Sequence, residues 1–81
     1  MNFGQAVEQL KAGSKVARSG WNGKGMWLTL VPAWDYNPSD RNSPAGIEKL
    51  PWIGMKTADN KFIPWLASQT DILAEDWEIV H

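Results

Sequence analysis

The sequence predicts a single α+β domain, in which a small twisted antiparallel sheet packs with an N-terminal helix and a short C-terminal helix. Three observations support this fold class. Apolar residues near the N-terminus have helical spacing, and residues 26–31 alternate with the period of a strand. Short segments separated by turn residues follow, as in hairpins. The 81 residues suffice for one domain, so we treat residues 1–81 as a unit.

The N-terminal helix is predicted over residues 3–12. Asn2 and Gln5 have the spacing of a capping box, in which each side chain bonds the other residue's backbone N–H. One apolar stripe follows, formed by Phe3, Ala6, Val7 and Leu10. Gly13 suits the left-handed position after a helix. We therefore expect this helix to cover one face of the sheet.

Two hairpins are predicted next. Residues 15–19 and 26–31 read as strands joined by the turn-forming pair Asn22-Gly23. Both faces of the 26–31 strand are largely apolar, which favours a central position in the sheet. The second hairpin comprises residues 52–57 and 61–65, and Pro64 places its second strand at an edge or ends it there.

The C-terminal part predicts a short helix and a closing strand. Either Ser68 or Thr70 can cap the helix, and Asp71 suits its first turn. Residues 76–80 read as a strand with Trp77 and Ile79 directed inward. We expect Trp77 to be a core residue.

Residues 32–51 form a long proline-rich segment. It contains four prolines among polar residues and is longer than most loops, and long loops are commonly functional or disordered. Trp34 and Tyr36 argue against simple disorder, because aromatic side chains favour a surface to lie on. The segment is therefore either a lid or subunit-contact loop, or a passive insertion.

Composition excludes several classes of protein. The chain has no cysteine, so disulfides and thiolate chemistry are absent. Apolar runs are short and no secretion-type leader is recognisable, so we expect neither membrane insertion nor export. The net charge of −1 disfavours binding to long nucleic acid. Four bases and no acid between Gln9 and Trp34 still suit a small anion.

We expect no catalytic activity, no cofactor and no metal site. The single histidine, His81, is the final residue, so no histidine–nucleophile pair is available. Asp71 could form a carboxylate pair with Glu75 or Asp76, but solvation of a helix explains these charges better. Binding is therefore the more plausible activity.

Residues 20–27, Gly-Trp-Asn-Gly-Lys-Gly-Met-Trp, form the most informative stretch. Its glycines leave backbone accessible to a ligand, and its two tryptophans offer flat π faces beside a lysine. This pattern suits a planar anionic molecule. A plain hairpin with core tryptophans would give the same local pattern, and the Gly-x-Gly at 23–25 is too short for a phosphate-loop fingerprint.

Four segments carry a resemblance to a known family: residues 3–6, the run 15–26 (Lys-Val-Ala-Arg-Ser-Gly-Trp-Asn-Gly-Lys-Gly-Met), residues 55–59 and the block 64–77. In these segments the chain resembles the second Thoeris anti-defence family of small phage proteins. These segments cover about two-thirds of the chain in order, whereas residues 32–51 carry no specific match.

The resemblance implies a sponge that binds a cyclic ADP-ribose isomer made by a bacterial TIR-domain enzyme and withholds it from its effector. It implies homotetramers of compact α+β subunits with ligand pockets between protomers, acting in the cytoplasm of the infected host. Some relatives also bind cyclic oligonucleotides at a separate site, and the sequence does not tell whether this chain does.

Candidate ligand residues follow from the chemistry of such a nucleotide. Trp21 and Trp65 could stack on adenine, at about 1–3 kcal/mol per base. Backbone N–H groups of residues 23–25, with Lys24 or Arg18, could bind the pyrophosphate, as could the start of the 68–71 helix. Trp27, Trp34 or Trp52 would line the pocket or the subunit interface. The full predicted set is Arg18, Trp21, Asn22, Gly23, Lys24, Gly25, Trp27, Trp65, Ser68, Gln69, Thr70 and Asp71.

Three alternatives stay open. Helix capping would equally explain the polar residues 68–71. The chain could instead be a protein-binding module that inhibits a host protein through the aromatic segment 32–51. Binding to single-stranded nucleic acid is a third, weaker hypothesis, which a steep salt dependence would support.

Overall fold

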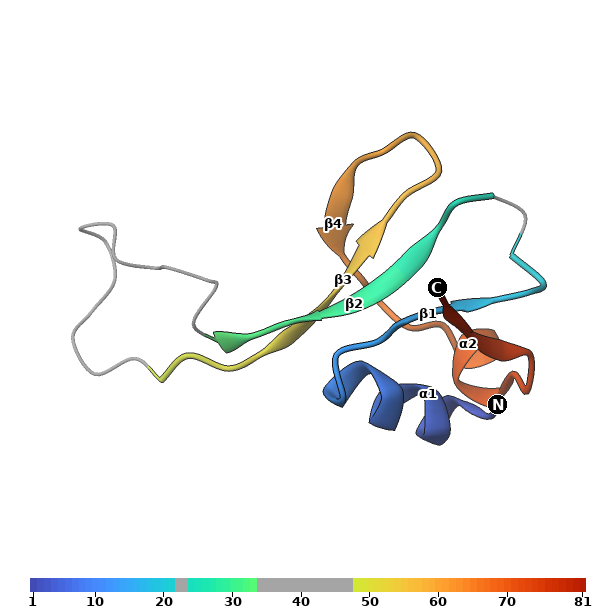
Figure 1. The fold of residues 1–81 in the computed structure, drawn as a ribbon, viewed down its shortest axis with the longest axis horizontal. Helices are drawn as coiled ribbons and strands as arrows, with labels where there is room; N and C mark the ends of the chain where they lie inside the picture. The colour runs from blue at the N-terminus through green and yellow to red at the C-terminus, as the bar shows by residue number, and fades with distance from the viewer. Residues whose placement is uncertain (22–23, 34–47) are drawn as a thin grey trace.

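The computed structural model describes residues 1–21, 24–33 and 48–81, which form two helices and a five-stranded sheet (Figure 1). The elements in chain order are α1 (Phe3–Lys11), β1 (Lys15–Arg18), β2 (Trp27–Val31), β3 (Trp52–Lys56), β4 (Phe62–Pro64), α2 (Gln69–Leu73) and β5 (Trp77–Val80). The predicted α+β class, with an N-terminal helix, an antiparallel sheet and a short C-terminal helix, is confirmed.

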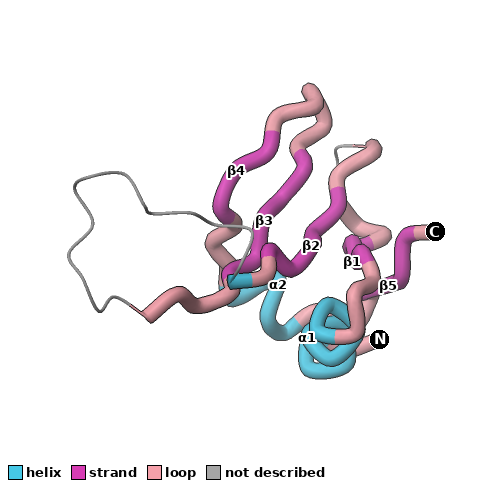
Figure 2. The backbone as a smooth tube through the Cα atoms, turned by 60° about the vertical axis from the view of Figure 1, so that its left-hand side comes forward, coloured by secondary structure: helices cyan, strands magenta, loops and turns pink. Residues whose placement is uncertain are grey.

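The sheet has the order β4-β3-β2-β1-β5, and every neighbouring pair is antiparallel. The first strand therefore pairs with the last, which brings the two ends of the chain together (Figure 2). The central position of β2 is confirmed, and β4 with Pro64 lies at an edge, as predicted. The register pairs Val16 with Leu28 and Leu28 with Met55.

One face of the sheet packs against α1. Its buried residues are Ala6 and Leu10 from the helix and Val16, Leu28 and Trp77 from three strands. The helical stripe predicted from spacing is thus the face that contacts the sheet. Trp77, only 2% exposed, is a core residue as expected. Burial of these apolar side chains is the main source of stability for so small a domain.

The opposite face, which we call the open sheet face, consists of the alternate residues of the same strands. Neither helix packs on it, because α1 and α2 both contact residues of the first face. Within the described residues it presents a row of partly exposed apolar side chains, Trp27, Val31, Trp52 and Phe62. Trp52 and Phe62 contact each other with ring centroids 5.9 Å apart. The Phe62 ring also covers Gly54, where a Cβ would collide with the ring carbons of Phe62.

The local signals for both helices are confirmed. Asn2 and Gln5 form the capping box of α1, and Gly13 follows this helix with a φ of +97°. Ser68, not Thr70, is the N-cap of α2. The turn predicted at Asn22-Gly23 and the aromatic residues Trp34 and Tyr36 lie outside the described residues.

Candidate functional site

Arg18, at the end of β1, joins three segments of the chain. It is the register partner of Trp77, so both side chains lie on the helix-covered face. Its Nε donates to Asp76 Oδ1 at 2.8 Å, and its Nη1 donates to Asp71 Oδ1 at 2.9 Å. The Arg18 side chain is 17% exposed. The guanidinium therefore connects β1 to α2 and to the start of β5.

The electrostatics of this cluster do not favour an anion. The Arg18 hydrogen bond holds the pKa of Asp76 below its usual value. For Asp71, burial raises the pKa, but hydrogen bonds from Arg18, Ser68 and Trp21 outweigh it and the net pKa is lowered. Both carboxylates are thus ionised at neutral pH, and together with one guanidinium they carry a formal charge of −1. Arg18 consequently contributes little attraction for a phosphate group.

Trp21, three residues after Arg18 in the chain, is fixed by two contacts. Its indole Nε1 donates to Asp71 Oδ1 at 3.2 Å, and its ring packs edge-on against Trp77 with centroids 5.4 Å apart at 80°. The preceding residue, Gly20, donates its backbone N–H to Asp76 Oδ2 at 2.8 Å. A Cβ at Gly20 would lie 2.7 Å from that oxygen, so a glycine is needed for this approach.

Trp65 and Trp21 belong to one aromatic cluster, which comprises Phe3, Trp21, Trp65 and Trp77. The Trp65 ring centroid is 6.0 Å from that of Trp77 at 86°, and 6.1 Å from that of Phe3. Trp77 is buried at the centre of the cluster. Trp21 and Trp65 each contact the Trp77 ring and are themselves partly exposed. The two residues predicted to stack on a base are therefore joined through one buried indole.

The polar residues of α2 divide into two pairs. Ser68 and Asp71 form a capping box: Ser68 Oγ accepts from the Asp71 N–H at 3.1 Å and donates to Asp71 Oδ2 at 2.9 Å. Gln69 and Thr70 are exposed on the first turn. The capping explanation thus accounts for Ser68 and Asp71, and Gln69 and Thr70 present their side chains to solvent.

The remaining predicted residues that the structure describes, Lys24, Gly25 and Trp27, lie where the connection from β1 enters β2. Gly25 has a φ of +80°, and its carbonyl accepts from Lys56 Nζ at 2.8 Å. Trp27 lies on the open sheet face, where Lys15 Nζ is 4.3 Å from its ring centroid. Lys24 is exposed, and Asn22 and Gly23 fall outside the described residues. The structure therefore separates Trp27 from Trp21 by placing them on opposite faces of the sheet.

Three residues that contribute to these contacts were not predicted as site residues from the sequence. Asp76 binds Arg18 and Gly20, and two lysines flank Trp27: Lys15 above its ring and Lys56 as its register partner on β3. The signal for Lys15 was the basic bias of the N-terminal half. Lys56 and Asp76 reach the site only through strand pairing, which local pattern does not encode.

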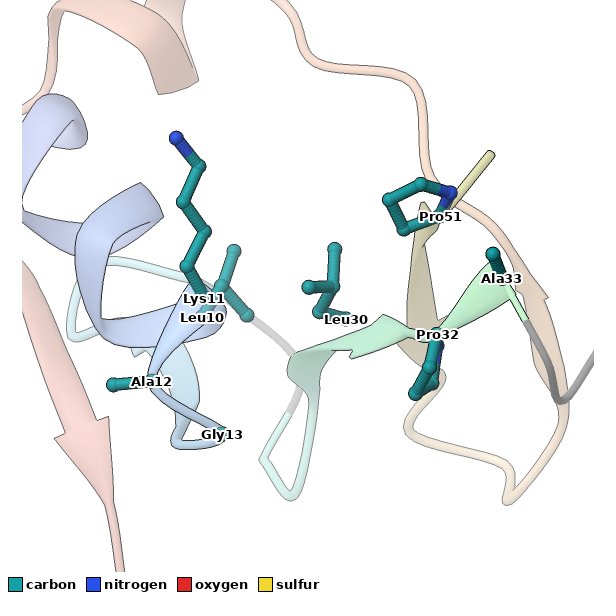
Figure 3. Close-up of a pocket in the computed structure, with 8 residues that line it drawn as sticks. All are labelled: Leu10, Lys11, Ala12, Gly13, Leu30, Pro32, Ala33 and Pro51. Atoms are coloured by element: carbon teal, nitrogen blue, oxygen red, sulfur yellow. The ribbon is translucent and has the colours of Figure 1, made fainter. Parts of the chain in front are cut away.

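An apolar pocket of about 500 Å³ lies elsewhere, between the end of α1 and the end of β2 (Figure 3). It is lined by Leu10, Lys11, Ala12, Gly13, Leu30, Pro32, Ala33 and Pro51. The last carbonyls of a helix carry partial negative charge, so this lining disfavours an anion despite the Lys11 ammonium. Of the predicted ligand residues that the structure describes, none lines it.

Among residues 1–21, 24–33 and 48–81, no three acidic or histidine side chains cluster as metal ligands would. Within the same ranges, both helices are too short to cross a bilayer.

Two comparisons with known proteins agree on one family. Residues 1–80 match the model of the Tad2-like family, described as the Thoeris anti-defense 2-like domain. The chain is also 51% identical to Thoeris anti-defense 2 of Bacillus phage SP01 over 85 aligned residues, which cover 99% of this chain and 94% of that protein. Both matches span nearly the whole chain and include the segments that build the Arg18 cluster and the aromatic cluster. The chain therefore belongs to the Thoeris anti-defense 2-like family.

Proposed function

We propose that this protein is a phage anti-defence protein that binds and sequesters a cyclic ADP-ribose isomer, without degrading it, in the cytoplasm of the infected host. Withholding the signal would keep the Thoeris effector inactive. The observation that carries the proposal is the nearly full-length match to a Thoeris anti-defense 2 protein at 51% identity. The aromatic cluster and the exposed Lys24 supply the chemical support.

The base of the nucleotide is assigned to the aromatic cluster. Trp21 and Trp65 are each partly exposed and each held by a buried neighbour, so they offer π faces whose orientation is already fixed. Stacking of a base on an aromatic side chain contributes about 1–3 kcal/mol. The exposed side chains of Gln69 and Thr70 stand near this cluster on α2 and suit hydrogen bonds to ribose hydroxyls or adenine edges.

The pyrophosphate is assigned to the lysine-rich end of the same connection. Lys24 is exposed there, and Lys56 already reaches the Gly25 carbonyl. Lysine ammonium groups act as point charges for phosphate, whereas Arg18 is neutralised by two carboxylates. Of the two basic residues that the sequence offered for this role, Lys24 is therefore the better supported.

Tight sequestration requires more contact than this surface alone provides. A nanomolar dissociation constant corresponds to about −12 kcal/mol, which one or two stacked rings cannot supply. Enclosure between subunits would provide the rest, so we include a homo-oligomer in the proposal, and a tetramer is the form that the family resemblance implies. The open sheet face, with its partly exposed tryptophans and valine, offers an apolar surface for such assembly.

The proposal is tested by isothermal titration with the cyclic ADP-ribose isomer produced by a TIR-domain enzyme. Lys24→Ala should weaken binding by about ten- to a hundredfold, since a charge-assisted hydrogen bond is worth about 1.5–3 kcal/mol. The matched control is Lys61→Ala, an exposed lysine whose partner is Asp59 in the β3–β4 turn. Equal affinities for the parent and the Lys24 variant would remove Lys24 from the site.

A second candidate function is supported by the apolar pocket of Figure 3. Pro32, Ala33 and Pro51 of the proline-rich segment line it, and such a pocket suits an apolar side chain of a host protein. This alternative predicts that Leu30→Glu, which places a charge in the pocket, abolishes anti-defence activity while nucleotide affinity is retained. If Leu30→Glu loses anti-defence activity because it no longer binds the nucleotide, this alternative is excluded.

A further inference from the structure

We propose that Asp71 is a positioning residue, which holds the Trp21 indole in its binding orientation and does not itself contact the ligand. This inference rests on the proposed function, because it concerns the same nucleotide site. It differs from the sequence-based prediction, which included Asp71 among the candidate ligand residues with helix capping as the alternative.

The first step is the hydrogen-bond capacity of the carboxylate. An ionised aspartate offers about four acceptor positions. Asp71 Oδ1 accepts from Arg18 Nη1 at 2.9 Å and from Trp21 Nε1 at 3.2 Å. Its Oδ2 accepts from the Ser68 N–H at 3.3 Å and from Ser68 Oγ at 2.9 Å. All four positions are filled by the protein, so none remains for a ligand hydroxyl.

The second step is the position of Asp71 in the fold. The Asp71 backbone carbonyl accepts from Trp77 Nε1 at 2.9 Å, so main chain and side chain of one residue bind two different indoles. These two indoles also contact each other edge-on. Asp71 therefore fixes the Trp21 ring relative to the buried Trp77 ring, and α2 is the element that carries this constraint.

The third step is the effect on binding. A tryptophan that is immobilised only when the ligand arrives loses rotamer freedom at that moment, and this loss lowers the affinity. A ring already held by Asp71 and Trp77 avoids this loss. Trp21 stays partly exposed while its indole N–H is bound, so the contact orients the ring and leaves part of the side chain accessible.

The experiment compares Asp71→Asn with Asp76→Asn in the full-length protein. Hydrogen exchange of indole N–H groups is followed by NMR, with the Trp21 signal identified by its absence in Trp21→Phe. Asp71→Asn replaces the charged acceptor of the Trp21 N–H with a neutral amide oxygen, which is a weaker acceptor, so exchange at Trp21 should accelerate. Exchange at Trp77 should not change, because the Trp77 N–H bonds the unchanged backbone carbonyl of residue 71. Asp76→Asn, which breaks the contacts to Arg18 and Gly20 instead, should leave the Trp21 signal protected.

Affinity for the cyclic ADP-ribose isomer completes the test through a double-mutant cycle. Asp71→Asn should weaken binding by about three- to tenfold in the parent, which is about 0.7–1.4 kcal/mol. In the Trp21→Phe background the same change should weaken it less than about twofold, because the bond through which Asp71 acts is already missing. Should Asp71→Asn fail to fold, Ser68→Ala, which removes one donor to Oδ2, provides the same comparison at smaller amplitude.

Three outcomes would overturn the inference: unchanged Trp21 exchange in Asp71→Asn, equal loss of protection at Trp21 and Trp77, or additive effects in the cycle. Additive losses would mean that Asp71 contacts the ligand or acts on stability alone. If the parent does not bind the nucleotide, the proposed function fails. The exchange rates then still decide whether Asp71 holds Trp21, so the two failures are distinguishable.

Discussion

At the scale of single residues, the Arg18 cluster shows how a charge obvious in the sequence acquires an unexpected role. Arg18 lies in a basic stretch and was a natural candidate for a phosphate. In the fold it binds Asp71 and Asp76, which are 53 and 58 positions away in the chain. Local spacing in the sequence cannot predict partners so far along the chain, because these contacts follow from the pairing of β1 with β5. The residue type predicted a charge, and only the topology determined its partner.

The same cluster predicts a specific response to acid. The pKa values of Asp71 and Asp76 are lowered in the folded protein, so their contribution to stability is present above the unfolded pKa of about 4. As the pH falls below that value, through the folded pKa values, this contribution is lost. Urea unfolding between pH 7 and pH 2 should therefore show a loss of stability in this window.

Arg18→Met provides the control for this acid response. It removes the partner that lowers both pKa values, so the variant should lose less stability between pH 5 and pH 2 than the parent, although it starts from a lower value at pH 7. An identical pH dependence in parent and variant would mean that other carboxylates dominate the acid response.

At the scale of elements, most of the fold could be predicted from the sequence, because the signals for its helices and strands are local. The capping box at Asn2, the glycine after α1 and the proline of β4 each act within a few residues, and each was confirmed. The choice between Ser68 and Thr70 as the cap of α2 was left open, because both hydroxyls have suitable chemistry. The structure decides for Ser68, whose hydroxyl and backbone both bind Asp71.

The cap of α2 yields a testable difference between two neighbouring hydroxyl residues. Ser68→Ala should lower the free energy of unfolding by about 1 kcal/mol, which is the usual cost of losing an N-cap. Thr70→Ala is the matched control and should change stability by less than half of that, because Thr70 is exposed within the first turn. Urea denaturation of the three proteins measures both values. Equal losses in the two variants would contradict the assignment of Ser68 as the cap.

At the scale of the whole molecule, the sheet separates two surfaces of different chemistry. The helix-covered face holds the aromatic cluster and the neutralised Arg18, whereas the open sheet face presents Trp27 with its two flanking lysines. The sequence predicted these residues as one set because most of them lie close together along the chain. Their distribution over two faces depends on the alternation and register of β1, β2 and β3, which a list of residues does not specify.

Assembly through the open sheet face leads to a prediction at this scale. Val31→Lys places a charge among the partly exposed apolar side chains of that face and should reduce the molar mass measured by light scattering. Ala58→Lys adds the same charge in the exposed β3–β4 turn and should leave the molar mass unchanged. A parent protein that is already monomeric, or a Val31 variant with the parent's mass, would contradict this role of the face.

The central claim is that the protein captures a small nucleotide signal and leaves it chemically intact. Titration of the parent protein with the cyclic ADP-ribose isomer, followed by denaturation and mass analysis of the released ligand, tests it most directly. We predict saturable binding with a nanomolar dissociation constant and full recovery of the unmodified nucleotide. Absence of binding by the folded protein, or recovery of a cleaved product, would contradict the account.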